Sequence, residues 1–147
     1  FGTMTVDPAH KGPILCLAFS TGIGPIVSIA AAIADQNPEA DLRLYWGAAE
    51  AEELFLPDDI AAALPLNGQL VLCADDGELD SGIVHPGSAL DAVRADFDTL
   101  EGWLAYAAGP PRLVEAAAPL LYSIGLAADA FRADAFFTEQ DKQKSPS

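Results

Sequence analysis

The chain is poor in basic residues, with seven Lys and Arg against 22 Asp and Glu, which gives a net charge of −15 at pH 7. Nucleic acids and anionic membranes attract proteins through clustered cations, so this balance argues against both as partners. No uninterrupted apolar stretch approaches the roughly 20 residues that span a bilayer. The first residues also lack a basic segment followed by an apolar one, the pattern of a secretory signal. We therefore expect a cytoplasmic protein with no nucleic-acid or membrane partner.

Cysteine and histidine are scarce as well, with two of each. Cys16 and Cys73 both lie inside apolar, strand-like runs, which predicts buried, reduced thiols in preference to a disulfide or a metal pair. His10 lies in a linker-like stretch, and His85 lies at an expected helix start. No Ser-His-Asp set, paired cysteine motif or carboxylate–histidine cluster is present. The sequence therefore predicts no metal site and no hydrolytic centre.

What the chain does contain is a regular alternation of strand and helix patterns. Its 147 residues, 51% of them hydrophobic, suit one domain with a sizeable core. Strands are predicted at Ile14–Phe19, Leu42–Trp46, Gln69–Ala74, Trp103–Ala107 and Phe131–Ala133. Such alternation predicts a doubly wound, five-stranded parallel sheet in the order 3-2-1-4-5, with its ligand at the carboxyl ends of the strands.

Four helices are expected between these strands. The first begins at Pro25, because proline has no N–H and the first helical residue needs none. The second covers about Ala48–Ala63, and the third covers about Pro86–Asp96. The last opens at Gly109-Pro110-Pro111 and ends at Gly125. Apolar faces are predicted at Ile26, Val27, Ile29, Ala30 and Ile33 in the first helix, and at Leu113, Ala117, Leu120 and Ile124 in the last.

The turn Ser20-Thr21-Gly22-Ile23-Gly24-Pro25 is the most informative segment, because it joins a buried strand directly to a helix. Such a turn aims free backbone N–H groups and the positive end of the helix at one point, and proteins hold phosphate in this way without a metal. A purely structural strand-to-helix turn is the alternative. The full dinucleotide fingerprint is not present, because Val27 lies where a third glycine would fall.

Four segments, in this order, resemble the pyridine-nucleotide domain of the ferredoxin–NADP reductase superfamily, a family of flavin-dependent reductases. They are AFSTGIGPIVSI (Ala18–Ile29), LYWGAAEAEELFL (Leu44–Leu56), YAAGPPRLVEAA (Tyr106–Ala117) and RADAFF (Arg132–Phe137). The resemblance implies an NAD(P)-binding domain over residues 13–137. It also implies that residues 1–12 are a linker from a missing N-terminal flavin-binding barrel, and that residues 138–147 form a flexible tail.

The resemblance also implies which residues bind the cofactor. The pyrophosphate would lie on the backbone of Ser20, Thr21, Gly22, Ile23, Gly24 and Pro25, and the adenosine end would lie near Gly47, Asp75 and Asp76. Gly109, Pro110 and Pro111 would shape the nicotinamide pocket. Asp134 and Phe136 would match the family's terminal acidic–aromatic pair, which approaches the flavin; edge-of-core packing is the alternative for Phe136.

Arg112 follows in the first turn of the last predicted helix. A cation is unfavourable at a helix N-terminus, so a nearby phosphate or ribose would explain it; a solvated surface charge is the alternative. Four positions depart from the family pattern. Phe19 and Ser20 replace glycines and would add side chains near the pyrophosphate, Ala49 replaces an arginine, and Ala108 replaces a cysteine near the nicotinamide. No catalytic residue is assigned beyond Ala108 at that position and Phe136 near the flavin.

The resemblance implies a domain that takes NADH and presents it to FAD or FMN bound by the missing domain in cis. Electrons would then pass to an iron–sulfur centre elsewhere in the same chain, to a ferredoxin or to an iron–sulfur oxygenase component. NADH is expected in preference to NADPH, because no Lys or Arg lies between Leu44 and Val93, whereas Asp75 and Asp76 would repel a 2′-phosphate. The substitutions at Ser20, Ala49 and Ala108 favour a second hypothesis, a nucleotide-binding regulatory or subunit-docking module without reductase activity. A flavodoxin-like flavin carrier is a weaker third.

Overall fold

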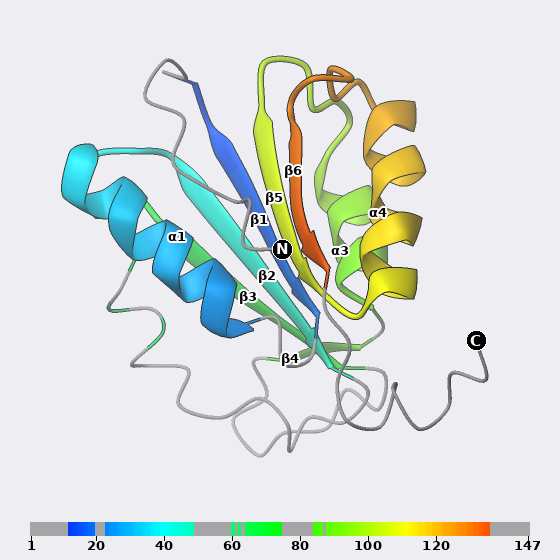
Figure 1. Cartoon of the computed structure of the whole chain (residues 1–147), viewed down its shortest axis with the longest axis horizontal. Helices are drawn as coiled ribbons and strands as arrows, with labels where there is room; N and C mark the ends of the chain where they lie inside the picture. Colours follow the sequence, from blue (N-terminus) through cyan, green and yellow to red (C-terminus); the bar gives the residue numbers. More distant parts are fainter. Residues whose placement is uncertain are drawn as a thin grey trace.

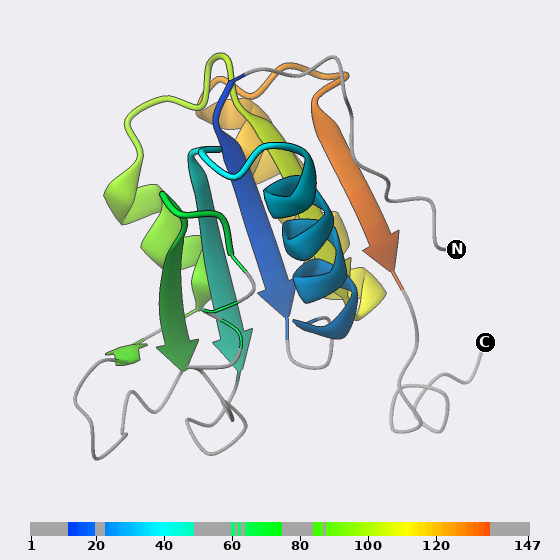
Figure 2. The ribbon, with the colours of Figure 1, turned by 90° about the vertical axis from the view of Figure 1, so that its left-hand side faces the viewer.

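The computed structural model describes residues 12–19, 23–48, 60, 62, 64–74, 84–86 and 88–135. These residues form one parallel sheet between two helical layers (Figure 1). Its strands are β1 (Ile14–Phe19), β2 (Leu42–Ala48), β3 (Gln69–Ala74), β4 (Val84–Pro86), β5 (Leu104–Gly109) and β6 (Phe131–Ala135). Their order is β4-β3-β2-β1-β5-β6, and each neighbouring pair is parallel (Figure 2).

The predicted sheet is confirmed, since the five expected strands are present in the expected order. The sheet also has one strand that the sequence analysis did not predict, the three-residue β4, which pairs with the carboxyl half of β3 from Leu72 to Ala74. Pro86 ends β4, an edge position where proline's missing N–H is tolerated. The prediction of a helix from about Pro86 was therefore wrong at its start, because α3 covers Ala89–Asp96.

The three helices with described bounds divide between the two faces of the sheet. Helix α1 (Ile23–Gln36) covers one face, whereas α3 and α4 (Pro111–Ser123) cover the other, as Figure 2 shows. Strand β1 supplies both cores: Cys16 and Ala18 lie in the cluster beneath α1, and Leu15, Leu17 and Phe19 lie in the cluster beneath α3 and α4. Burial on both faces explains why β1 is a continuous apolar run.

The predicted apolar face of α1 is confirmed, because Ile26, Ile29, Ala30 and Ile33 are buried and Val27 packs against them. The helix begins at Ile23, so Pro25 is its third residue and not its first. Proline is still tolerated there, since the first four N–H groups of a helix have no intrahelical acceptor.

The predicted apolar face of α4 is displaced by about one residue. The buried residues are Val114, Ala117 and Leu121, whereas Leu113 and Ile124 are half-buried at the border of the same cluster. Gly125 has a φ of +104° and follows the end of the helix, as predicted. The expected helix over Ala48–Ala63 lies almost wholly outside the described residues, within which Ile60 and Ala62 are helical.

Cys16 and Cys73 are free and buried, as predicted. They belong to the two different core clusters, on opposite faces of the sheet. Burial raises the pKa of the Cys16 thiol far above its usual range. Burial, assisted by Asp96 and Asp91, raises the pKa of Cys73 to about 12. Both thiols are therefore protonated at neutral pH, and neither is prepared to act as a nucleophile.

Candidate functional site

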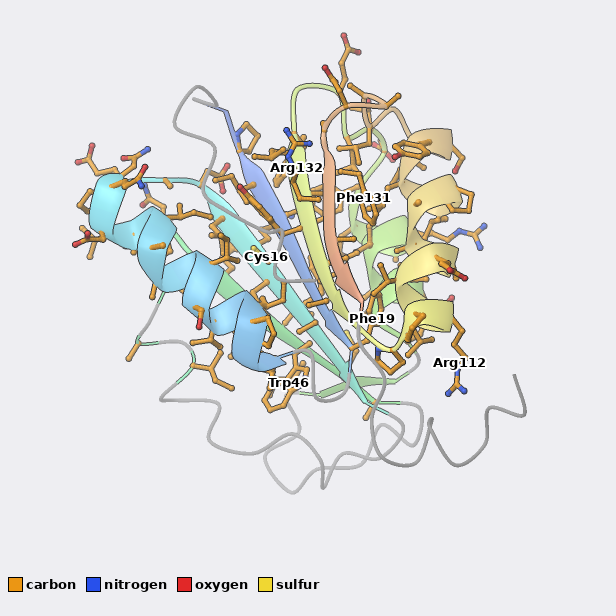
Figure 3. All side chains as sticks on the ribbon, viewed as in Figure 1. Cys16, Phe19, Trp46, Arg112, Phe131 and Arg132 are labelled. Carbon is orange, nitrogen blue, oxygen red and sulfur yellow. The ribbon has the colours of Figure 1, made fainter. Side chains whose placement is uncertain are left out.

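The carboxyl edge of the sheet brings together predicted site residues from four strands. Ala18 of β1 pairs with Ala108 of β5, which in turn pairs with Asp134 of β6. On the other side of β1, Phe19 pairs with Gly47 of β2. Figure 3 shows Phe19, Trp46 and Arg112 at this same end of the molecule. Ligands of open α/β sheets bind at this edge, so the topology places the predicted residues where a site is expected.

The first turn of α1 lies at this edge, because the helix follows β1 after three intervening residues. Ile23 is buried against the sheet, whereas Gly24 is exposed. A Cβ built on Gly24 would meet no heavy atom within 4 Å. Packing in the described structure therefore does not require glycine here. The open position beside the free N–H groups of the helix fits a ligand that approaches the backbone closely, as a pyrophosphate does.

Gly109, in contrast, is required by the fold. It has a φ of +146°, and a Cβ on it would lie 2.7 Å from the Phe19 carbonyl oxygen and 2.8 Å from the Phe19 Cβ. The end of β5 is thus pressed against the end of β1. Pro110 caps α4, and Pro111 is its first residue, so the turn from strand to helix has little freedom. These residues form a rigid floor at the predicted nicotinamide end.

The side chains of Phe19 and Ala108 are both turned into the core. Phe19 is only 4% exposed and packs in the cluster beneath α3 and α4. The expectation that its ring would add bulk at the pyrophosphate was therefore wrong. Ala108 is fully buried in the cluster beneath α1, where its neighbours include Ala18. The Cβ of a cysteine at position 108 would therefore also lie in this buried cluster.

Arg112 is the second residue of α4, and its side chain is exposed. Figure 3 shows it extending from the helix at the carboxyl end of the sheet. Glu115 lies one turn further on and is also exposed, and within the described residues no ion pair joins the two. A helix N-terminus repels a cation, so Arg112 lies where an anion would relieve that repulsion.

Several predicted site residues lie outside the described residues: Ser20, Thr21, Gly22, Ala49, Asp75, Asp76 and Phe136. Asp134 is described by its backbone alone, which pairs with Ala108. Within the described ranges, no three His, Cys, Asp or Glu side chains gather in a group that could hold a metal ion. No helix in those ranges is long and apolar enough to cross a membrane.

Helix α3 contributes to this edge in a way that the sequence analysis missed. A Cβ on Gly47 would lie 3.0 Å from the Cβ of Ala89, the first residue of α3. Ser88 caps the helix: its side chain accepts a hydrogen bond from Asp91 N at 3.1 Å, and Asp91 Oδ2 accepts one from Ser88 N at 3.4 Å. The Ser-x-x-Asp spacing is a signal for this cap, but no local signal pairs Gly47 with Ala89.

The sequence was also compared with known families and proteins. Residues 17–118 match a family model described as an oxidoreductase NAD-binding domain. Reductase component 2 of terephthalate 1,2-dioxygenase from Comamonas sp. is 30% identical over 141 residues, which cover 94% of this chain and 42% of that protein. The ferredoxin–NAD(P)⁺ reductase component of the naphthalene 1,2-dioxygenase system from Pseudomonas putida is 28% identical over 138 residues, covering 92% and 42%. The chain thus spans about two fifths of the length of these relatives.

Two solved structures share this fold over most of the chain. The cytochrome P450 reductase GcoB of Amycolatopsis superposes with a TM-score of 0.76 at 25% identity, covering 89% of this chain and 40% of that one. A ferredoxin reductase in carbazole 1,9a-dioxygenase superposes with a TM-score of 0.75 at 25% identity and covers the same shares.

Proposed function

Because this chain belongs to the oxidoreductase NAD-binding domain family, we propose that it is the NADH-binding domain of a flavin-dependent electron-transfer reductase. The observation that carries this proposal is the carboxyl edge of the sheet, to which the open position at Gly24, the rigid Gly109–Pro111 turn and the exposed Arg112 all belong. A dinucleotide needs these three features: a close backbone approach for its pyrophosphate, a fixed pocket for its nicotinamide and a cation for its charge.

In this proposal the chain binds and orients NADH, and the reacting groups belong to the cofactors. NADH gives up a hydride, which carries two electrons, and a flavin held outside these residues accepts it. Gly109 and Pro110 would fix the nicotinamide, while the first turn of α1 would hold the pyrophosphate. Asp134, which pairs with Ala108, would lie on the flavin side together with Phe136.

The electrons would leave the flavin one at a time for an iron–sulfur centre or a ferredoxin. The relatives from Comamonas and Pseudomonas are reductase components of dioxygenase systems, and this supports a ferredoxin or an oxygenase component as the partner. The flavin, FAD or FMN, would be bound by a domain of the same protein outside this chain.

A nucleotide-binding regulatory or docking module is the second candidate. Alanine at position 108, where the family has a cysteine, favours it. This module and the reductase domain would both bind NADH, but only the reductase domain would support reduction of a flavin. Restoring the flavin domain and following flavin bleaching after mixing with NADH would separate the two.

Titration of the 147-residue chain with NADH by isothermal calorimetry tests the binding proposal directly. We expect saturable binding that Arg112→Gln weakens about five- to tenfold, because one charge-assisted contact to phosphate contributes roughly 1–1.5 kcal/mol. Arg94→Gln is the matched control: Arg94 is an exposed cation in the last turn of α3, away from the carboxyl edge. Absence of saturable NADH binding to the parent chain would refute the proposal. If Arg112→Gln and Arg94→Gln weaken NADH binding equally, Arg112 is not part of the binding site.

Gly24→Ala should separate stability from binding. An alanine in a helix is more favourable than a glycine, and its Cβ would meet nothing in the described structure. We therefore expect the free energy of unfolding to rise by about 0.5 kcal/mol. The same methyl group would occupy the space into which the pyrophosphate must come, so NADH affinity should fall about tenfold. Urea denaturation and calorimetry on the same samples measure both quantities, and unchanged affinity would exclude Gly24 from the site.

A further inference from the structure

Ala108 was expected near the nicotinamide, but its surroundings in the structure point to a different role. It is fully buried in the cluster beneath α1, and it pairs with Ala18 of β1, which is fully buried in the same cluster. Each of the two strands has one further residue before it ends, Phe19 in β1 and Gly109 in β5. The side chain of Phe19 lies in the other cluster, and glycine has none. The two alanines are therefore the last side chains that β1 and β5 place beneath α1.

The first turn of α1 rests on these two alanines. The helix packs against β1 and β5, and Figure 2 shows it lying along these strands. It begins at the carboxyl edge and runs back along the sheet, so its first turn lies over the last row of the two strands. Ile23 and Ile26 of that turn are buried in the same cluster as the alanines. The volume of the two alanine side chains therefore limits how closely the first turn approaches the sheet.

The sizes of the facing side chains are complementary along the helix. In the next row on this face, Cys16 pairs with Tyr106, whose side chain is fully buried in the same cluster. Two strand residues rise about 6.6 Å, a distance that roughly four helical residues also cover. The corresponding step along α1 leads from Ile26 to Ala30, which is fully buried too. Large helix residues thus lie over small strand residues at the carboxyl edge, and the reverse holds one row further in. In such a densely packed layer, added volume at Ala108 must displace the end of the helix.

We propose that Ala108 is a positioning residue for the pyrophosphate, which acts through the first turn of α1 and not by touching the nicotinamide. Its small side chain lets this turn settle on the end of β5, and the turn carries the exposed Gly24. The inference rests on the proposed function, since it assumes that the first turn of α1 holds the pyrophosphate. It differs from a contact role in one consequence. A larger residue at position 108 should weaken even a ligand that has the pyrophosphate but no nicotinamide.

The test is calorimetric titration of Ala108→Val, in the 147-residue chain, with NADH and with ADP-ribose, which has the pyrophosphate and both riboses but no nicotinamide. Both ligands should be weakened by the same factor, about five- to tenfold, because overpacking displaces the first turn of α1. Ala18→Val adds the same volume on the neighbouring strand and should cause the same equal loss. A loss confined to NADH would mean that residue 108 contacts the nicotinamide, and unchanged affinity for both ligands would mean that the turn does not depend on residue 108. Either result would overturn the inference.

Ala107→Val is the matched control. Ala107 is the preceding residue of β5 and is also fully buried, but it lies in the cluster beneath α3 and α4, on the opposite face of the sheet. The substitution adds the same volume and should lower stability to a similar extent, while the affinities for NADH and ADP-ribose stay within about twofold of the parent values. If Ala107→Val weakens the two ligands as much as Ala108→Val does, the loss reflects general destabilisation and the inference is wrong.

Hydrogen exchange of the backbone amides measures the displacement of the helix without any ligand. Ala108→Val should accelerate exchange in α1 more than in α4, and Ala107→Val should do the opposite. Unchanged exchange in α1 of Ala108→Val would contradict the inference. If Ala108→Val does not fold, Ala108→Cys and Ala107→Cys repeat the comparison with a smaller side chain. Failure of the parent chain to bind NADH would instead refute the proposed function.

Discussion

Replacement of Gly109 by alanine is expected to lower the free energy of unfolding by about 3 kcal/mol. Two effects add at this position. A φ of +146° is strained for any residue with a side chain, which costs roughly 1–2 kcal/mol. The new Cβ would also lie 2.7 Å from the Phe19 carbonyl oxygen, a backbone atom of the central strand that cannot turn away, and such overpacking costs roughly 1–3 kcal/mol. Urea denaturation of the 147-residue chain measures the change.

Gly102→Ala is the matched control for this prediction. Gly102 also has a positive φ, +86°, but a Cβ there would meet nothing within 4 Å. Its replacement should therefore cost about 1 kcal/mol, the strain alone. If Gly109→Ala and Gly102→Ala lower the free energy of unfolding equally, the contact between Gly109 and Phe19 does not constrain the carboxyl edge.

Preference for NADH over NADPH is expected to be about a hundredfold in affinity. The 2′-phosphate of NADPH needs Arg or Lys partners, and the sequence has none between Leu44 and Val93. Asp75 and Asp76 follow β3 in this range, and Asp91 lies in the first turn of α3. One unmatched like charge at close range costs a few kcal/mol, which corresponds to roughly a hundredfold in dissociation constant. Calorimetric titrations with the two nucleotides measure the ratio.

Charge reversal at the same positions provides the control. Asp75→Arg or Asp76→Arg should narrow the preference by at least tenfold, mainly through tighter NADPH binding. Glu101→Arg introduces the same charge change in the turn before β5, at the amino end of the sheet, and should leave the ratio unchanged. Equal binding of the two nucleotides by the parent chain would mean that the adenosine end does not lie beside β3.

The strand order could be predicted from the sequence because each strand is a short apolar run followed by a helical pattern, and crossovers between parallel strands are right-handed. Strand β4 could not, since three residues that end in proline carry no periodic signal. The predicted apolar face of α4 was displaced because helical spacing alone does not locate the centre of the buried stripe. Leu113 and Ile124 repeat at helical spacing, but they lie at the border of the buried stripe, and Val114 and Leu121 occupy its centre.

The glycines at the site show most clearly what a sequence pattern leaves open. Gly24, Gly47 and Gly109 occur in motifs that resemble the same family, and the resemblance assigns all three to the cofactor. In the structure Gly24 faces open space, Gly47 faces Ala89 and Gly109 faces the backbone of Phe19. These differences depend on residues distant in the chain, so local spacing contains no information about them. The orientation of Phe19, in contrast, follows from the local pleat of β1, which turns alternate residues toward opposite cores.

The central position of β1 has a consequence for how the chain folds. On one side of β1 lie β2, β3 and β4, each paired with the strand that precedes it in the sequence. On the other side, β5 and β6 form a separate pair. The two halves of the sheet meet at one ladder, where Ile14 lies beside Leu104 and Ala18 beside Ala108. Forming the β1–β5 ladder closes a longer loop than any other ladder of the sheet. The chain therefore loses conformational entropy before the contacts of this ladder can stabilise the fold. The β1–β5 ladder is therefore the step that makes the two halves one cooperative unit.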